Sequence, residues 1–111
     1  MSQNITKWSS YCDLDLERLS DATSHNVRVE VVEIKGSGKC PLGIKVGDTY
    51  EFGAFPPSGF CVWATYVIFP FVTALRFGGD FKEFEEEEGI VHCCCIDPNN
   101  PVVFRLSRID D

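Results

Sequence analysis

The sequence has few basic residues. It contains ten Lys and Arg among 17 Asp and Glu, which gives a formal net charge of -7 over 111 residues. Nucleic-acid binding needs a concentrated basic surface, because much of the affinity comes from Lys and Arg placed on phosphates. The charge balance therefore argues against a nucleic-acid partner. Much of the acidity is local, in "EFEEEE" at 83–88, which we interpret as a solvated loop or helix end.

A secretory signal and a clear membrane span are also missing. The opening "MSQNITKWSSYCDLDLERLSD" has no basic start followed by an apolar core, so we expect a cytoplasmic protein whose cysteines are reduced. The charge-free stretch at 58–75 has 18 residues, which is at the lower edge of the length that spans a bilayer. Pro70 in its middle and the lack of an upstream basic cluster favour a buried core helix and no membrane partner.

Two common catalytic motifs are absent as well. The segment "GSGKCPLG" at 36–43 lacks both the spacing and the following helix that a phosphate-binding loop requires. A serine nucleophile elbow does not occur either. Acid–base chemistry, thiol chemistry or a metal held by sulfur remain.

What is present predicts one small domain. Alternating or apolar runs between Gly- and Pro-rich turns indicate four strands and one helix. The expected strands are 27–34, 49–55, 89–96 and 101–109, and the expected helix is 59–77. Residues 27–111 should form a single α+β domain, in which one long apolar helix packs on a small, mostly antiparallel sheet. Residues 1–26 should form an N-terminal arm or a short helix.

One strand and the helix each contain a break in these patterns. In the first strand Val27, Val29 and Val31 alternate toward a core, but Val32 and Ile34 break the alternation late. In the helix, Pro70 should either produce a kink or divide the helix in two.

The six cysteines are the most distinctive feature, above all in "IVHCCCID" at 90–97. Neighbouring side chains of a strand point to opposite faces. One face should carry Cys93, Cys95 and Asp97, and the other His92 and Cys94. Strand alternation therefore argues against a single site that uses all three consecutive cysteines.

A metal site has little support from spacing. Zinc sites are usually built from two C-x2-4-C pairs on tight turns, and no such pair occurs here. A zinc or iron site built from Cys40, Cys61, Cys93 and Cys95 is still geometrically feasible, and Asp97 or His92 could replace one ligand.

Catalysis by a thiol is the competing interpretation. Cys61 should lie in the first turn of the helix, where the helix dipole favours a thiolate, whereas Cys12 lies in the polar arm. Cysteine is also often buried as a small apolar residue, and His92 on an apolar strand is more often a satisfied core histidine than a base. Trp63 and Tyr66 could line a pocket or belong to the core. Arg76, directly after the apolar helix, could hold a carboxylate or enolate oxygen or cap the helix.

Several short motifs occur in an order that resembles a family of small, largely uncharacterised cysteine-containing proteins. They are CP at 40–41, KVGD at 45–48, GFCVWA at 59–64, ALRFGGDF at 74–81, the cysteine cluster with Asp97, and PVVFRLSRI at 101–109. The resemblance covers about residues 27–109 and picks out Cys40, Cys61, Cys95 and Asp97, with Cys93 or Cys94 as a fourth thiol. This chain departs from the family's D-G-x-R-P-V turn, since Pro98 replaces the Gly and Asn100 the Arg.

Two hypotheses follow. The first is a small enzyme of the isomerase, lyase, dehydratase or cyclase type that acts on a small metabolite, either without a cofactor or with a metal. Cys61, Cys95 and Asp97 would carry the chemistry, and Trp63, Tyr66 and Arg76 would bind the substrate. The second is a non-catalytic module in which the same cysteines hold a structural zinc or simply pack.

Overall fold

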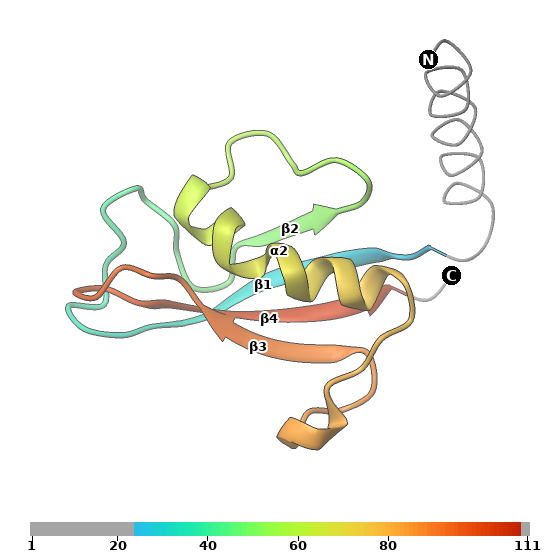
Figure 1. Ribbon diagram of the computed structural model, residues 1–111. Coiled ribbons are helices and arrows are strands. Elements are labelled where there is room, and N and C mark those ends of the chain that lie inside the picture. Colours follow the sequence, from blue (N-terminus) through green and yellow to red (C-terminus); the bar gives the residue numbers. More distant parts are fainter. Residues whose placement is uncertain (1–23, 110–111) are drawn as a thin grey trace, which may run out of the picture.

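A computed structural model describes residues 24–109 of the chain (Figure 1). Most of the predicted N-terminal arm, including Cys12, lies outside these residues. The described elements, in chain order, are β1 Asn26–Ile34, β2 Thr49–Phe52, α2 Val62–Arg76, the 3-10 helix η1 Lys82–Phe84, β3 Ile90–Cys94 and β4 Val102–Ile109.

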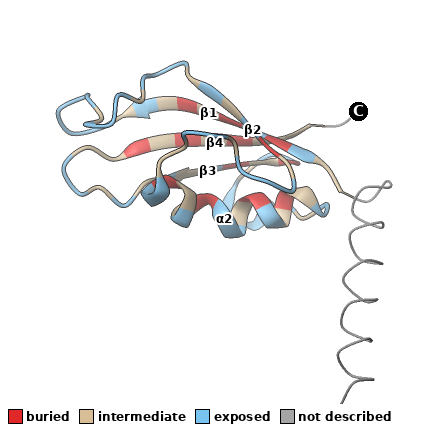
Figure 2. Cartoon of the chain, turned by 90° about the horizontal axis from the view of Figure 1, so that it is seen from above, coloured by how far each residue is buried: buried red, intermediate tan, exposed pale blue. Residues whose placement is uncertain are grey.

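The four strands form one antiparallel sheet in the order β2-β1-β4-β3. β1 and β4 are the central pair, and β2 and β3 are the edges. α2 connects the two edge strands and lies on one face of the sheet (Figures 1 and 2). The predicted α+β class is confirmed at this level, as an antiparallel sheet with one helix.

The expected long apolar helix is shorter in the structure than predicted. The helix has 15 residues, Val62–Arg76, and not the range 59–77. It begins late because Gly59 has a positive φ of 78° and Cys61 is still extended at φ -62°, ψ 134°. It ends at the positive φ of Gly78, 88°, a backbone region that favours glycine. Pro70 lies inside the helix without dividing it.

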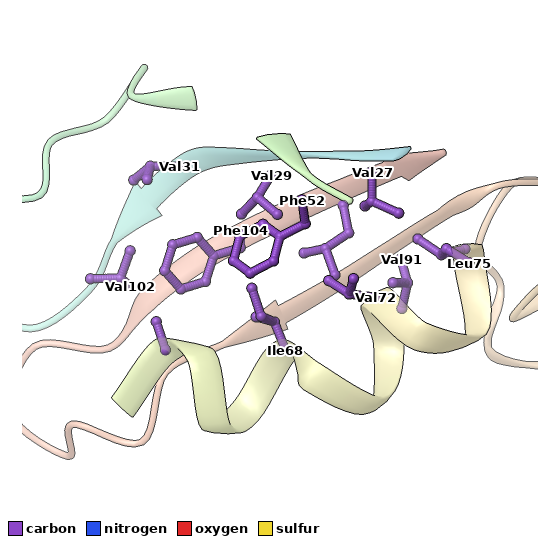
Figure 3. Close-up of a cluster of buried hydrophobic side chains, with 12 residues drawn as sticks. Val27, Val29, Val31, Phe52, Ile68, Val72, Leu75, Val91, Val102 and Phe104 are labelled. Atoms are coloured by element: carbon purple, nitrogen blue, oxygen red, sulfur yellow. The ribbon is translucent and has the colours of Figure 1, made fainter. Parts of the chain in front are cut away.

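The core lies between α2 and the sheet (Figure 3). Four helix residues at spacings of four and three face it, namely Ala64, Ile68, Val72 and Leu75. The strands contribute Val27, Val29, Val31, Phe52, Val91, Val102, Phe104 and Leu106. Only this stripe of the helix is buried, since Val62 and Tyr66 are each 75% exposed. A helix with one buried stripe is the usual partner of a single sheet face.

The late break in the β1 pattern is a β-bulge. Val31 pairs with Phe104 and Glu33 with Val103, so that Val32 is an additional residue on β1. After the bulge the alternation shifts by one residue, and Ile34 packs against the core. A bulge has this effect because it adds one residue to one strand of the pair.

Arg108 of β4 fixes the C-terminal end of α2. Its Nη1 donates to the carbonyl oxygens of Leu75 at 3.1 Å and Gly79 at 2.8 Å, and its Nη2 donates to Asp80 Oδ1 at 3.2 Å. A cation at this position adds a donor to carbonyl groups at the end of the helix and complements the helix dipole. The sequence suggested Arg76 for this capping role.

Within residues 24–109, no helix combines the length and the hydropathy that a membrane crossing demands. The charge-free stretch at 58–75 supplies part of a loop and most of α2 instead.

Candidate functional site

A pocket of about 440 Å³ opens at the end of the molecule where α2 begins. Figure 1 shows that the loop after β1 and the turn between β3 and β4 extend to this end. Three segments far apart in the sequence line the pocket: Cys40, Pro41 and Leu42; Cys61, Val62 and Trp63; and Cys95, Asp97, Asn99 and Asn100. The structure thus brings together four residues that the sequence singled out as a group, Cys40, Cys61, Cys95 and Asp97.

Cys61 is held in place by the residue before it. The Phe60 ring contacts Tyr50 and Phe52 edge-on, at centroid distances of 4.7 Å and 5.1 Å, and approaches Phe104 at 5.9 Å. These ring contacts attach the start of α2 to the sheet. Cys61 is the N-cap residue, one position before the first turn of α2 and not within it as predicted, and its side chain makes no capping hydrogen bond. Cys61 therefore lies at the N-terminal end of α2, where it lines the pocket.

Cys95 lies directly after β3 and continues its pairing with β4. Its backbone amide donates to the carbonyl oxygen of Val102 at 2.9 Å, and the amide of Val102 donates to Cys95 Sγ at 3.2 Å. These two bonds fix the position of the Cys95 sulfur beside β4. Cys95 is half-buried and packs against the core cluster.

Asp97 organises the turn that closes the pocket. Its Oδ1 accepts hydrogen bonds from the backbone amides of Asn99 at 2.9 Å and Asn100 at 3.3 Å. This is the usual way in which aspartate stabilises a turn. The carboxylate is consequently fixed in orientation at the edge of the pocket.

The turn is attached to the loop after β1. Ser37 donates to Asn100 Oδ1 from both its backbone amide and its hydroxyl, and the amide of Lys35 donates to the Pro101 carbonyl at 2.8 Å. The side chain of Asn100 therefore connects the turn to the loop after β1.

Cys93 faces the core and not the pocket lining. Burial, followed by the nearby Cys94 and Glu86, raises the pKa of the Cys93 thiol to about 12. A thiol with this pKa is protonated at neutral pH. Cys93 is therefore a packing residue in this structure.

Cys94 and His92 lie on the opposite face of the strand, and both are exposed. This distribution agrees with the strand alternation expected from the sequence. His92 is not a core histidine, because its ring is exposed and lies beside Glu86. The distance from His92 Nδ1 to Glu86 Oε1 is 2.9 Å.

The proposed metal ligands do not form a compact cluster. Within the part of the chain that the structure describes, no three His, Cys, Asp or Glu side chains are arranged so that they could hold a metal ion. Cys40, Cys61 and Cys95 share a pocket, and each is a free thiol.

The three predicted substrate-binding residues lie at different places. Trp63 is 51% exposed and lines the thiol pocket. Tyr66 lies on the outer face of α2, in a shallow apolar groove with Phe69 and Pro70. Arg76 is at the other end of the helix, about 20 Å from Cys61 at the usual rise per residue. Its Nε donates to the carbonyl oxygen of His25 at 3.3 Å, and its guanidinium lies over the Phe77 ring.

Sequence reasoning missed several pocket residues. Leu42 and Asn99 had no recognisable signal, because both belong to loops whose course depends on tertiary contacts. Phe60 does not line the pocket but attaches Cys61 to the sheet, and its place directly before Cys61 is visible in the sequence. Comparisons of the chain with protein-family models, with curated proteins and with solved structures gave no match.

Proposed function

We propose that the thiol pocket binds a small, partly apolar metabolite and that the protein converts it by thiol-based acid–base chemistry of the lyase or isomerase type. One observation carries this proposal. Three free thiols and a carboxylate from three separate segments line the same pocket beside the indole of Trp63. Packing alone would call for apolar side chains here, whereas convergent polar groups in an apolar pocket are typical of small-molecule sites.

The residues have different roles in this proposal. Cys61 is the thiolate that removes a proton or attacks the substrate, since it lies at the positive end of α2. Cys95 is the second thiol, whose sulfur is held in position by the amide of Val102. Asp97 orients the substrate or acts as a second acid–base group. The indole of Trp63 and the side chain of Leu42 provide the apolar wall.

In a step of this type one group removes a proton from a carbon atom and a neighbouring acid returns a proton elsewhere on the same molecule. No redox cofactor is needed for such a step. A reducing compartment such as the cytoplasm would keep the thiols free.

The test uses the complete chain and a panel of small carbonyl compounds with acidic C–H groups in heavy water. Proton NMR should show deuterium incorporation or isomerisation for a member of the panel. Replacement of Cys61 or Cys95 by Ser should lower this rate by about 100-fold or more, while the unfolding midpoint changes little. Cys94→Ser is the matched control, because this thiol lies on the other face of β3, and it should retain the rate.

A non-catalytic module is the second candidate. The packing of Cys40, Cys61 and Cys95 against the core favours it. If the serine variants of Cys61 and Cys95 fail to fold, these thiols are structural.

Metal analysis of the purified protein separates the two candidates further. One equivalent of zinc or iron that is lost together with stability on chelation would support the module, because metal binding energy is then folding energy. A stable, metal-free protein would support the enzyme.

A further inference from the structure

The charged groups around the thiol pocket indicate which kind of ligand it accepts. Of the ten residues that line the pocket, Asp97 is the one carboxylic acid, and none is Lys, Arg or His. The three cysteines of the lining can be neutral or negative, but a thiol has no positively charged form in water. The lining groups that can carry a charge are therefore all of one sign.

Asp97 has one carboxylate oxygen engaged and one available. Oδ1 accepts the backbone amides of Asn99 at 2.9 Å and Asn100 at 3.3 Å. Among residues 24–109, Oδ2 accepts no hydrogen bond, and Asp97 forms no ion pair. A carboxylate in this condition favours a positively charged donor, because a charge-assisted hydrogen bond is stronger than a neutral one.

The basic residues of the loop after β1 lie outside the pocket lining. Lys35, Lys39 and Lys45 are all exposed, so they leave the carboxylate of the pocket without a cation. The net charge of -7 over the chain acts in the same direction, since a negative protein attracts cations to its surface.

Trp63 is the second feature that suits a cation. It lines the same pocket and is 51% exposed. Indole is the aromatic ring that attracts a cation most strongly, through the negative charge on its face. Leu42 and Val62 add apolar surface to the lining, which fits a ligand with a charged group and an apolar part.

The N-terminal end of α2 is the feature that would favour an anion instead. The partial charge at a helix terminus is about half an elementary charge, whereas an ionised carboxylate carries a full charge. In the proposed function the thiolate of Cys61 lies at this end of the helix. An anionic substrate would therefore meet the negative charges of Cys61 and Asp97 and no cation of the lining.

We propose that the substrate of the thiol pocket carries a protonated amine, which donates to Oδ2 of Asp97 beside the indole of Trp63. The apolar part of the substrate then contacts Leu42 and Val62. This inference rests on the proposed function and adds a substrate class to it. Compounds that place a carboxylate or a phosphate in the pocket are disfavoured by the same charges.

The experiment uses the complete reduced chain and two thiol reagents of similar size and opposite charge. They are the methanethiosulfonates that carry an ethyltrimethylammonium group and an ethylsulfonate group. Peptide mapping gives the modification rate of each cysteine, which is divided by the rate of the same reagent with free cysteine. We expect the cationic reagent to modify Cys61 and Cys95 about tenfold faster than the anionic reagent, or more.

Asp97→Asn removes the charge and keeps an oxygen that can accept the two turn amides. The ratio of the cationic to the anionic rate at Cys61 and Cys95 should fall by about tenfold. Glu87→Gln is the matched control, because it removes one charge from an exposed acid outside the pocket lining, and it should leave the ratio unchanged. If Asp97→Asn lowers the unfolding midpoint, Asp97→Ser, which also keeps an oxygen acceptor, takes its place.

Two outcomes would overturn the proposal. The first is an anionic reagent that modifies Cys61 and Cys95 as fast as the cationic reagent. The second is an unchanged ratio in Asp97→Asn, which would mean that any preference comes from the net charge of the protein. The labelling needs no turnover and is independent of the deuterium-exchange experiment. A preference for the cation without exchange would contradict the proposed chemistry alone, and exchange without the preference would contradict this inference alone.

Discussion

The three consecutive cysteines show how strongly position within a strand controls the chemistry of a side chain. Cys93 points into the core, Cys94 points to solvent, and Cys95 follows the strand and lines the thiol pocket. Their sequence context is nearly identical, yet burial clearly raises the pKa of Cys93. Reactivity in this cluster therefore follows from which face each residue occupies.

The raised pKa of Cys93 predicts a loss of stability at alkaline pH. The unfolded thiol releases its proton near its ordinary pKa of 9.0, whereas the folded thiol holds it until about 12. The unfolded chain binds fewer protons in this window, so the free energy of unfolding should be constant below about pH 9 and should fall as the pH rises toward 12.

Urea unfolding at several pH values measures this effect. Cys93→Ala should flatten the alkaline decline relative to the parent protein. Burial, with Asp48 and Cys40 nearby, also raises the pKa of Tyr50, and Tyr50 is present in both proteins, so the difference between the two curves belongs to Cys93. Equal slopes would contradict the buried position of this thiol.

At the scale of the element, α2 has two unlike sides. Ile68 is fully buried, whereas the adjacent Phe69 is 67% exposed. A sequence with no charge from residue 62 to residue 75 suggested a helix surrounded by the core. The single sheet provides only one surface for packing, and the other apolar side chains of the helix consequently remain at the surface.

A pair of neighbouring substitutions tests this orientation of the helix. Ile68→Ala should lower the free energy of unfolding by about 2–5 kcal/mol, because it leaves a cavity in the core. Phe69→Ala should change it by no more than about 0.5 kcal/mol. Chemical denaturation measures both. A larger loss for Phe69→Ala than for Ile68→Ala would mean that the helix packs through its other side.

At the scale of the whole molecule, the thiol pocket depends on two loops that approach each other very closely. Gly36 has a φ of 69°, and a Cβ atom at this position would lie 1.9 Å from the carbonyl oxygen of Asn99. Asn99 and Asn100 in turn line the pocket. The absence of a side chain at residue 36 therefore allows the turn after Asp97 to lie where the pocket needs it.

Gly36→Ala should be more harmful than Gly38→Ala. Both positions have positive φ, 69° and 82°, and share a backbone cost of about 1–2 kcal/mol. Only Gly36 meets a neighbouring backbone, since nothing lies within 4 Å of a Cβ at Gly38, and overpacking should add about 1–3 kcal/mol. Urea unfolding measures the difference. The rate at which Cys61 and Cys95 are alkylated should also change in Gly36→Ala and not in Gly38→Ala. Equal stabilities and equal alkylation rates of the two variants would argue against the loop contact.

Much of the fold could be predicted because it depends on local patterns. Alternation in β1 placed Val27, Val29 and Val31 in the core, and the break after them corresponds to the bulge at Val32. The helix boundaries were less predictable. They depend on the extended Cys61 and on Arg108, which reaches the last turn from β4.

The candidate site was predictable in part. The grouping of Cys95 with Asp97, separate from Cys94, followed from strand alternation. The separation of Arg76 and Tyr66 from the thiol pocket did not, because aromatic and basic residues on one helix give no indication of which end or side meets the loops. The enzymatic roles of the pocket residues stay predictions.

The sequence by itself determined the types of the elements and the face on which each strand residue lies, because periodicity and turn chemistry act over a few residues. Only the tertiary structure decided that Cys40, Cys61 and Cys95 share one pocket and that His92 is oriented by Glu86. These contacts depend on the packing of the helix across the sheet and on the course of the loops. Such long-range geometry is set by the whole core and cannot be predicted from any local sequence pattern.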